Sequence, residues 1–265
     1  MRFNKYNSFI AGYLLLMIFY WIGIQISGIK DLPINLMYSF AINFPPFFGG
    51  IFGFAVAKHW GGLKSAVGKG IFYLALGTLS WSIGSFIWSY YNFFASQEVP
   101  YPSFADVGYG LAVPLWFIGI YFLSFATGAR LSLRKIGGRL YLMLLPIAIA
   151  IFSYYFLFIV ARNSSLDWQG GLLKIFFDIY YPVSDWVILT FSVLLWGLSL
   201  QYLGGKYKWP VLITLLGFMI MYFADFSFSY TTTVETYYNG SFPDLLFAVA
   251  MSVISIGITS MDAKT

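Results

Sequence analysis

Eight long apolar runs constrain what this chain can fold into more than any other feature of its sequence. A helix of about 20 residues crosses a bilayer core of about 30 Å, and only helices or closed barrels satisfy the backbone there. The runs are continuous rather than alternating, which favours helices over barrel strands. The sequence therefore predicts an all-α integral membrane protein with about eight transmembrane helices, at roughly residues 8–28, 33–57, 68–94, 103–127, 139–161, 172–203, 208–231 and 241–261.

The composition supports this class and excludes others. Hydrophobic residues make up 60% of the chain and charged residues 9%, whereas soluble domains carry about 25% charged residues. The connections are short, so we expect a single transmembrane domain over residues 1–265, without a catalytic or nucleic-acid-binding module. Cysteine is absent and His59 is the single histidine, which excludes disulfides and the usual thiolate or histidine-rich metal sites. We therefore expect no metal, no cofactor, no enzymatic activity and no nucleic-acid partner.

The basic residues sort by connection, which predicts the orientation in the membrane. The odd-numbered connections carry only Lys30, Arg162 and Lys174. The other basic residues lie before the first run, in or beside the even-numbered connections, or in the tail: Arg2, Lys5, Lys58, Lys64, Lys69, Arg130, Arg134, Lys135, Arg139, Lys206, Lys208 and Lys264. Because cytoplasmic loops are enriched in Lys and Arg, we expect a multi-pass protein of the cell membrane with both termini in the cytoplasm.

Two of the apolar runs open with the same short motif. Ser103-Phe104-Ala105-Asp106 begins one run and Ser241-Phe242-Pro243-Asp244 begins the other. Serine followed three residues later by a carboxylate resembles a capping box, in which each side chain binds a free backbone N–H at the helix start. Two capped helix starts therefore explain the motif without a ligand.

The segments before these motifs are alike as well, which predicts an internal repeat. Each begins with Leu-Gly, at Gly77 or Gly217, and continues through an aromatic- and serine-rich helix into a short acidic loop. The repeated unit is a helical hairpin that points outward. The fifth and sixth runs resemble a looser copy, and the first two runs resemble a weak one.

Carboxylates inside the runs are the candidate functional residues, because ionisable groups in a membrane are costly and indicate function by default. Our hypothesis is one outward-facing pocket for a small ligand or a cation, formed by Asp106, Asp178, Asp185, Asp225 and Asp244 with Tyr109, Tyr181, Tyr222 and Tyr230. Carboxylates supply charge, and tyrosines supply hydroxyls and cation–π faces. The alternative is that each Asp caps, pairs or hydrogen-bonds between helices. Capping suits Asp106 and Asp244, and Lys174 can pair with Asp178.

The same residues carry a resemblance to a known family. The chain is similar to multi-span membrane sensor regions that precede diguanylate cyclase or histidine kinase output domains in bacteria and archaea. The matching positions are Pro102, Ser103, Ala105, Asp106, Tyr109, Pro114, Leu115 and Gly119, then Asp178, Tyr181, Pro182 and Asp185, then Asp225, Tyr230, Gly240, Asp244 and Leu245. The likeness covers roughly residues 68–261. It implies a sensor-like module, and because the sequence ends at "SMDAKT", it implies signalling through a separate protein partner.

Two further readings of the chain stay open at this stage. One is a structural subunit of a membrane complex, in which all polar residues serve packing. The other is a small-solute or cation transporter, which we disfavour because we expect almost no buried polar residues in the inner half. In the second run, Pro45-Pro46 and the nearby Gly49 and Gly53 indicate either a broken helix or close helix packing, and the second is preferred.

Overall fold

The computed structural model describes residues 4–30, 33–95, 99–127, 129–165, 170–200 and 207–262, although not the side chains of Arg130 and Ser132. Within these ranges the chain forms helices and no strand. Eight spans are long and apolar enough to cross a membrane, which confirms the predicted class and number and indicates a lipid bilayer environment. They are α1 (Lys5–Ser27), α2 with α3 (Pro33–Ala41, Phe44–His59), α4 with η2 (Ala66–Ser89, Tyr90–Phe94), α5 (Ala105–Ala126), α7 with η3 (Ile136–Ser153, Tyr154–Val160), α8 (Leu172–Ser199), α9 (Lys208–Thr233) and α10 (Phe242–Ser260).

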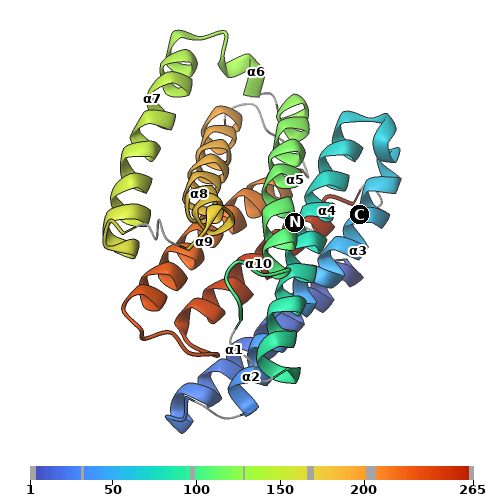
Figure 1. The fold of residues 1–265 in the computed structure, drawn as a ribbon. Helices are drawn as coiled ribbons and strands as arrows, with labels where there is room; N and C mark the ends of the chain where they lie inside the picture. The colour runs from blue at the N-terminus through green and yellow to red at the C-terminus, as the bar shows by residue number, and fades with distance from the viewer. Residues whose placement is uncertain are drawn as a thin grey trace.

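Both ends of the chain lie at the same end of the helix bundle. Asn4 Nδ2 donates to the carbonyl oxygen of Thr259 at 2.8 Å, and Asn7 Nδ2 donates to Ser260 Oγ at 2.9 Å. We call this the termini end; the short helices η1 (Gly62–Lys64) and α6 (Ala129–Ser132) lie in its connections. The α1–α2 and α9–α10 connections lie at the opposite end, at the lower side of Figure 1.

Helix α4 packs along α5, and α9 along α10, more closely than any other pair of helices. Glycine makes both approaches close. A β-carbon at Gly77 would lie 2.9 Å from the carbonyl oxygen of Ala112 on α5, and one at Gly217 would lie 3.2 Å from that of Ala250 on α10. Small residues at helix interfaces are the usual device for close approach in membranes. The two Leu-Gly sites of the sequence therefore have the same packing role.

The second span is broken between α2 and α3, and Asn43 lies at the break. The two prolines that follow remove backbone donors from this turn. Asn43 is fully buried; its Nδ2 donates to Ser89 Oγ at 2.9 Å, and its Oδ1 accepts from Ser85. Ser82 Oγ donates to the Asn43 carbonyl oxygen at 2.9 Å. Serines on one face of α4 thus satisfy the break, as non-helical backbone at membrane depth requires.

The glycines of α3 also pack closely, so a broken helix and close packing both occur in this span. A β-carbon at Gly49 would lie 3.1 Å from Ser255 Cα on α10, and one at Gly50 would lie 3.0 Å from the Ala75 carbonyl oxygen on α4. The preferred close packing is confirmed, and the break, which was the alternative, occurs as well. Pro45 and Pro46 lie in the first turn of α3, where a missing N–H costs no hydrogen bond within that helix.

The termini half of the bundle contains buried polar residues, and the expectation of almost none there was wrong. Thr214 and Thr259 are fully buried. Each hydroxyl donates to the carbonyl oxygen four residues earlier in its own helix, Thr214 to Pro210 at 3.0 Å and Thr259 to Ser255 at 2.8 Å. A threonine can lie inside an apolar helix because the carbonyl oxygens of that helix satisfy its hydroxyl group. The expectation did not take this into account.

Candidate functional site

A pair of carboxyl groups joins α8 and α9 well inside the spans. Asp185 and Asp225 are hydrogen-bonded to each other, and both side chains are half-buried. Two ionised carboxylates at this separation would repel, and a carboxyl group donates a hydrogen bond only when it carries a proton. A hydrogen bond between these groups therefore requires a proton on one of them, which makes the contact between α8 and α9 depend on ionisation. Helix spacing did not reveal this partner, because it lies on a different helix.

Asp106 begins α5 with the predicted cap. Its Oδ2 accepts from the backbone nitrogen of Ser103 at 2.6 Å, and Ser103 Oγ accepts from the backbone nitrogen of Ala105 at 3.2 Å. The buried carboxylate also accepts a hydrogen bond from the Tyr181 hydroxyl of α8. Ser103 and Asp106 thus make hydrogen bonds of the capping-box kind, although the residue directly before α5 is Phe104, whose side chain caps nothing. The same carboxylate links α5 to α8.

Asp244 begins α10 differently, and the serine cap expected there was wrong. Ser241 makes no side-chain cap. A capping oxygen accepts from the second or third helical residue, and Pro243, the second, has no N–H. Asp244 Oδ2 instead accepts from the Gly240 nitrogen at 2.7 Å and from Ser39 Oγ of α2 at 2.6 Å. Its Oδ1 accepts from the Tyr237 hydroxyl at 3.0 Å.

Tyr109 of α5 stands among these carboxyl groups. Its hydroxyl is hydrogen-bonded to Ser85 of α4. It also lies within electrostatic reach of Asp106, Asp225 and Asp244. Tyr109 thus has carboxyl groups of α5, α9 and α10 within electrostatic range of its hydroxyl. One pocket formed by all these groups stays a prediction.

Asp178 lies near the beginning of α8, at the end of the bundle opposite the termini, and pairs with Arg162. Arg162 Nη1 lies 3.4 Å from Asp178 Oδ1 and donates to the Asp178 carbonyl oxygen at 2.8 Å. The Tyr101 hydroxyl donates to Asp178 Oδ1 at 2.9 Å. Burial and the Asp178 carboxylate raise the pKa of the Tyr101 hydroxyl above its ordinary value, so Tyr101 stays a donor. The charge of Arg162 also reaches Asp185.

Tyr222 and Tyr230, the last two tyrosines of the predicted pocket, lie in different environments. The Tyr222 hydroxyl lies 3.2 Å from Ser153 Oγ of α7 and is buried within electrostatic reach of Asp185. Tyr230 is exposed and stacks on Phe226, with ring centroids 6.2 Å apart. Tyr222 thus connects α7 to the carboxyl pair, whereas Tyr230 stands outside this network.

Several polar residues of the site were missed in the sequence. They are Ser39, Asn43, Ser85, Tyr101, Arg162 and Tyr237. Asn43 carried a usable signal, because an amide inside an apolar run needs partners within the membrane. The tyrosines and serines carried none, since both types are frequent in this sequence.

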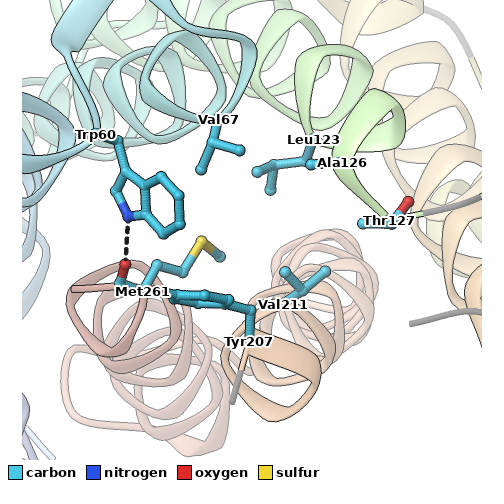
Figure 2. Close-up of a pocket in the computed structure, with 8 residues that line it drawn as sticks. All are labelled: Trp60, Val67, Leu123, Ala126, Thr127, Tyr207, Val211 and Met261. Carbon is cyan, nitrogen blue, oxygen red and sulfur yellow. Dashed lines mark hydrogen bonds between the residues drawn. The ribbon is translucent and has the colours of Figure 1, made fainter. Parts of the chain in front are cut away.

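A separate cavity of about 170 Å³ lies at the termini end (Figure 2). It is lined by Trp60, Val67, Leu123, Ala126, Thr127, Tyr207, Val211 and Met261. Trp60 Nε1 donates to the Met261 carbonyl oxygen at 2.7 Å across one side of it. Among the residues that the structure describes, the lining is mostly apolar and holds no carboxylate or amine. This cavity is therefore distinct from the predicted polar pocket.

No protein-family model, no curated protein and no solved structure matches this chain. The resemblance to sensor regions accordingly stays a prediction. The residue geometry is what remains to support a function.

Proposed function

We propose that this protein is a membrane sensor module in which a proton or a small cation at the Asp185–Asp225 pair controls the packing of α8 against α9. A partner protein then receives the change. The carboxyl pair itself carries this proposal, because it couples one ionisation event to the contact between two helices. The described chain lies almost entirely in helices and short connections, and the proposal assigns the output to that partner.

The chemistry of the pair gives two packing states. With one shared proton the carboxyl groups attract each other through a hydrogen bond. Without it, two negative charges lie side by side in a medium of low dielectric constant, where their repulsion is strong. A small cation between them would restore the attraction. A stimulus that binds one state better shifts the population toward it.

We also propose that α2–α5 and α8–α10 are two copies of one unit. Like the Gly77 and Gly217 sites, Gly119 and Gly257 pack alike: a β-carbon at Gly119 would lie 2.9 Å from the Leu74 nitrogen, and one at Gly257 would lie 2.6 Å from the Thr214 nitrogen. Each helix-start carboxylate also takes a hydroxyl from the other copy. The Ser39 hydroxyl donates a hydrogen bond to Asp244, and the Tyr181 hydroxyl donates one to Asp106.

The two copies differ at the corresponding polar pair. Asn43 follows Ser39 by one helical turn, as Asp185 follows Tyr181. The neutral Asn43–Ser85 pair of the first copy is buried and joined by a hydrogen bond from Ser85 Oγ to Asn43 Oδ1. The acidic Asp185–Asp225 pair of the second is half-buried. An inert first copy and a titratable second copy fit a module that senses at one site.

Infrared spectroscopy of the purified protein in lipid nanodiscs tests this function. We expect the carbonyl stretch of a protonated carboxyl group to shift in Asp185→Asn and in Asp225→Asn, and part of it to vanish in the double variant. Asp178→Asn is the matched control, because Asp178 lies on the same helix but pairs with Arg162; it should leave that part of the band unchanged.

A second measurement distinguishes a sensor from a structural subunit. Raising the pH should deprotonate the pair and increase amide hydrogen exchange in α8 and α9 of the wild type. The double variant should show no such pH response. An acid-form band that survives the double substitution would contradict the proton pair. Titration without any change in exchange would favour packing as the only role.

A further inference from the structure

Four buried oxygen atoms without hydrogen-bond partners belong to the elements that bind Asp244, at the opposite end of the bundle. Among the described residues, Asn35 Oδ1, Tyr38 OH, Asn239 Oδ1 and Ser241 Oγ are buried and unpartnered. The side chains of Asn35, Tyr38 and Ser241 are 1%, 0% and 5% exposed. A buried polar atom without a partner costs free energy, and native proteins contain few of them. Four in one neighbourhood indicate a missing binding partner.

Hydrogen bonds show that these atoms belong to one neighbourhood. Asn35 Nδ2 donates to the Asn239 carbonyl oxygen at 3.0 Å, which brings α2 against the α9–α10 connection. Ser39, one turn after Asn35, donates to Asp244 at 2.6 Å. Tyr38 lies within electrostatic reach of the same carboxylate. The oxygen atoms therefore come from α2, the 239–241 turn and the first turn of α10.

The Asp244 carboxylate is the charged member of this group, and it has no cationic partner in the part of the chain that the structure describes. It is 3% exposed. Its donors are two hydroxyls and one backbone N–H. The ion pairs of the described residues are His59–Asp262 and Arg162–Asp178, and Lys30 lies over the ring of Tyr238. An ionised carboxylate buried at membrane depth is costly without a counter-charge.

The unpartnered atoms specify the kind of partner. Asparagine Oδ1 is an acceptor only, and the hydroxyl oxygens offer lone pairs. Water could satisfy these acceptors, but only a cation that binds oxygen would also balance an ionised Asp244. One carboxylate among neutral oxygen ligands balances a single positive charge, and transporters coordinate Na⁺ with backbone carbonyl oxygens at broken helices. Burial and the Asp244 carboxylate raise the pKa of the Tyr237 hydroxyl, so Tyr237 stays a neutral donor.

We propose that Asp244 and the oxygen atoms of Asn35, Tyr38, Asn239 and Ser241 bind a sodium ion. The ion would hold α2 and the 239–241 turn against the start of α10, where Ser241 provides no cap. This site does not involve the Asp185–Asp225 pair and does not depend on the proposed sensor function.

Asp106 provides a matched control within the same chain. It heads the corresponding motif at the start of α5, and its serine accepts a backbone hydrogen bond and donates to the carboxylate. In the described residues around Asp106, namely 99–110, no buried side-chain oxygen lacks a partner. The motif alone therefore does not predict a cation at Asp106.

Thermal unfolding of the purified full chain tests the proposal, with NaCl replacing choline chloride at constant ionic strength. In the wild type we expect a saturable rise in Tm that KCl or choline does not reproduce, and line broadening in sodium NMR. Asp244→Asn should abolish both effects. Asp106→Asn should keep both, although its Tm without sodium should be lower.

Tyr38→Phe keeps the proposal testable if Asp244→Asn fails to fold, because it removes only an unpartnered hydroxyl. We expect its apparent affinity for Na⁺ to fall by about tenfold, a loss typical of damage to a metal site. A wild type without a sodium-specific response would overturn the proposal and leave trapped water as the occupant. A Tyr38→Phe protein with higher stability and an unchanged sodium response would overturn it as well.

Discussion

At the scale of single residues, the two Ser-Phe-x-Asp motifs show that the same letters give different local structures. Ser103 accepts a backbone hydrogen bond and Ser241 does not. One difference is that Ala105 has the N–H that binds Ser103 Oγ, whereas Pro243 at the corresponding position has none. Both carboxylates still bind a backbone N–H before the helix and a hydroxyl from a neighbouring element.

This difference predicts unequal effects of one substitution at the two motifs. Ser103→Ala should destabilise the protein by about 1 kcal/mol, the usual cost of losing a cap. Ser241→Ala should change the free energy of unfolding far less in sodium-free buffer, because the hydroxyl has no partner to lose. Chemical denaturation in detergent micelles measures both values. Equal losses in the two variants would contradict the assigned hydrogen bonds.

At the scale of elements, the second span combines a break with close packing, and contacts with α4 stabilise both. Its serines reach Asn43, while its small residues admit the glycines of α3. The two consecutive prolines in the sequence indicated that a break was possible. The face of α4 that satisfies it was not predictable, because the sequence does not say which helix lies beside the second span.

Substitution of Asn43 tests how much this break depends on its amide. Asn43→Ala should cost about 1–3 kcal/mol, because it removes two interhelical side-chain hydrogen bonds of about 0.6–1.7 kcal/mol each. Ser82→Ala, which loses one bond to the Asn43 carbonyl oxygen, is the control and should cost about half as much or less. A smaller loss in Asn43→Ala than in the control would show that the break is held by packing alone.

At the scale of the whole molecule, the sequence predicts best what the bilayer imposes and predicts poorly what neighbouring helices impose. The eight spans followed from run length, because each run has to match the thickness of the hydrocarbon core. The carboxyl pair did not follow. Tyr222 and Asp225 were expected in one pocket, yet the Tyr222 hydroxyl bonds to Ser153 and Asp225 bonds to Asp185. Partners across helices depend on which spans are adjacent.

The sorting of basic residues predicts one orientation of the whole bundle, with the termini end in the cytoplasm and the carboxyl neighbourhood in the outer half. Because the chain has no cysteine, single-cysteine variants report orientation without background labelling. A membrane-impermeant maleimide should label Thr233→Cys, at the exposed end of α9, on intact cells. Lys64→Cys, exposed in η1, should react only after permeabilisation. The reverse pattern would turn the Asp185–Asp225 pair toward the cytoplasm, and the proposed sensor would then respond to an internal proton or cation.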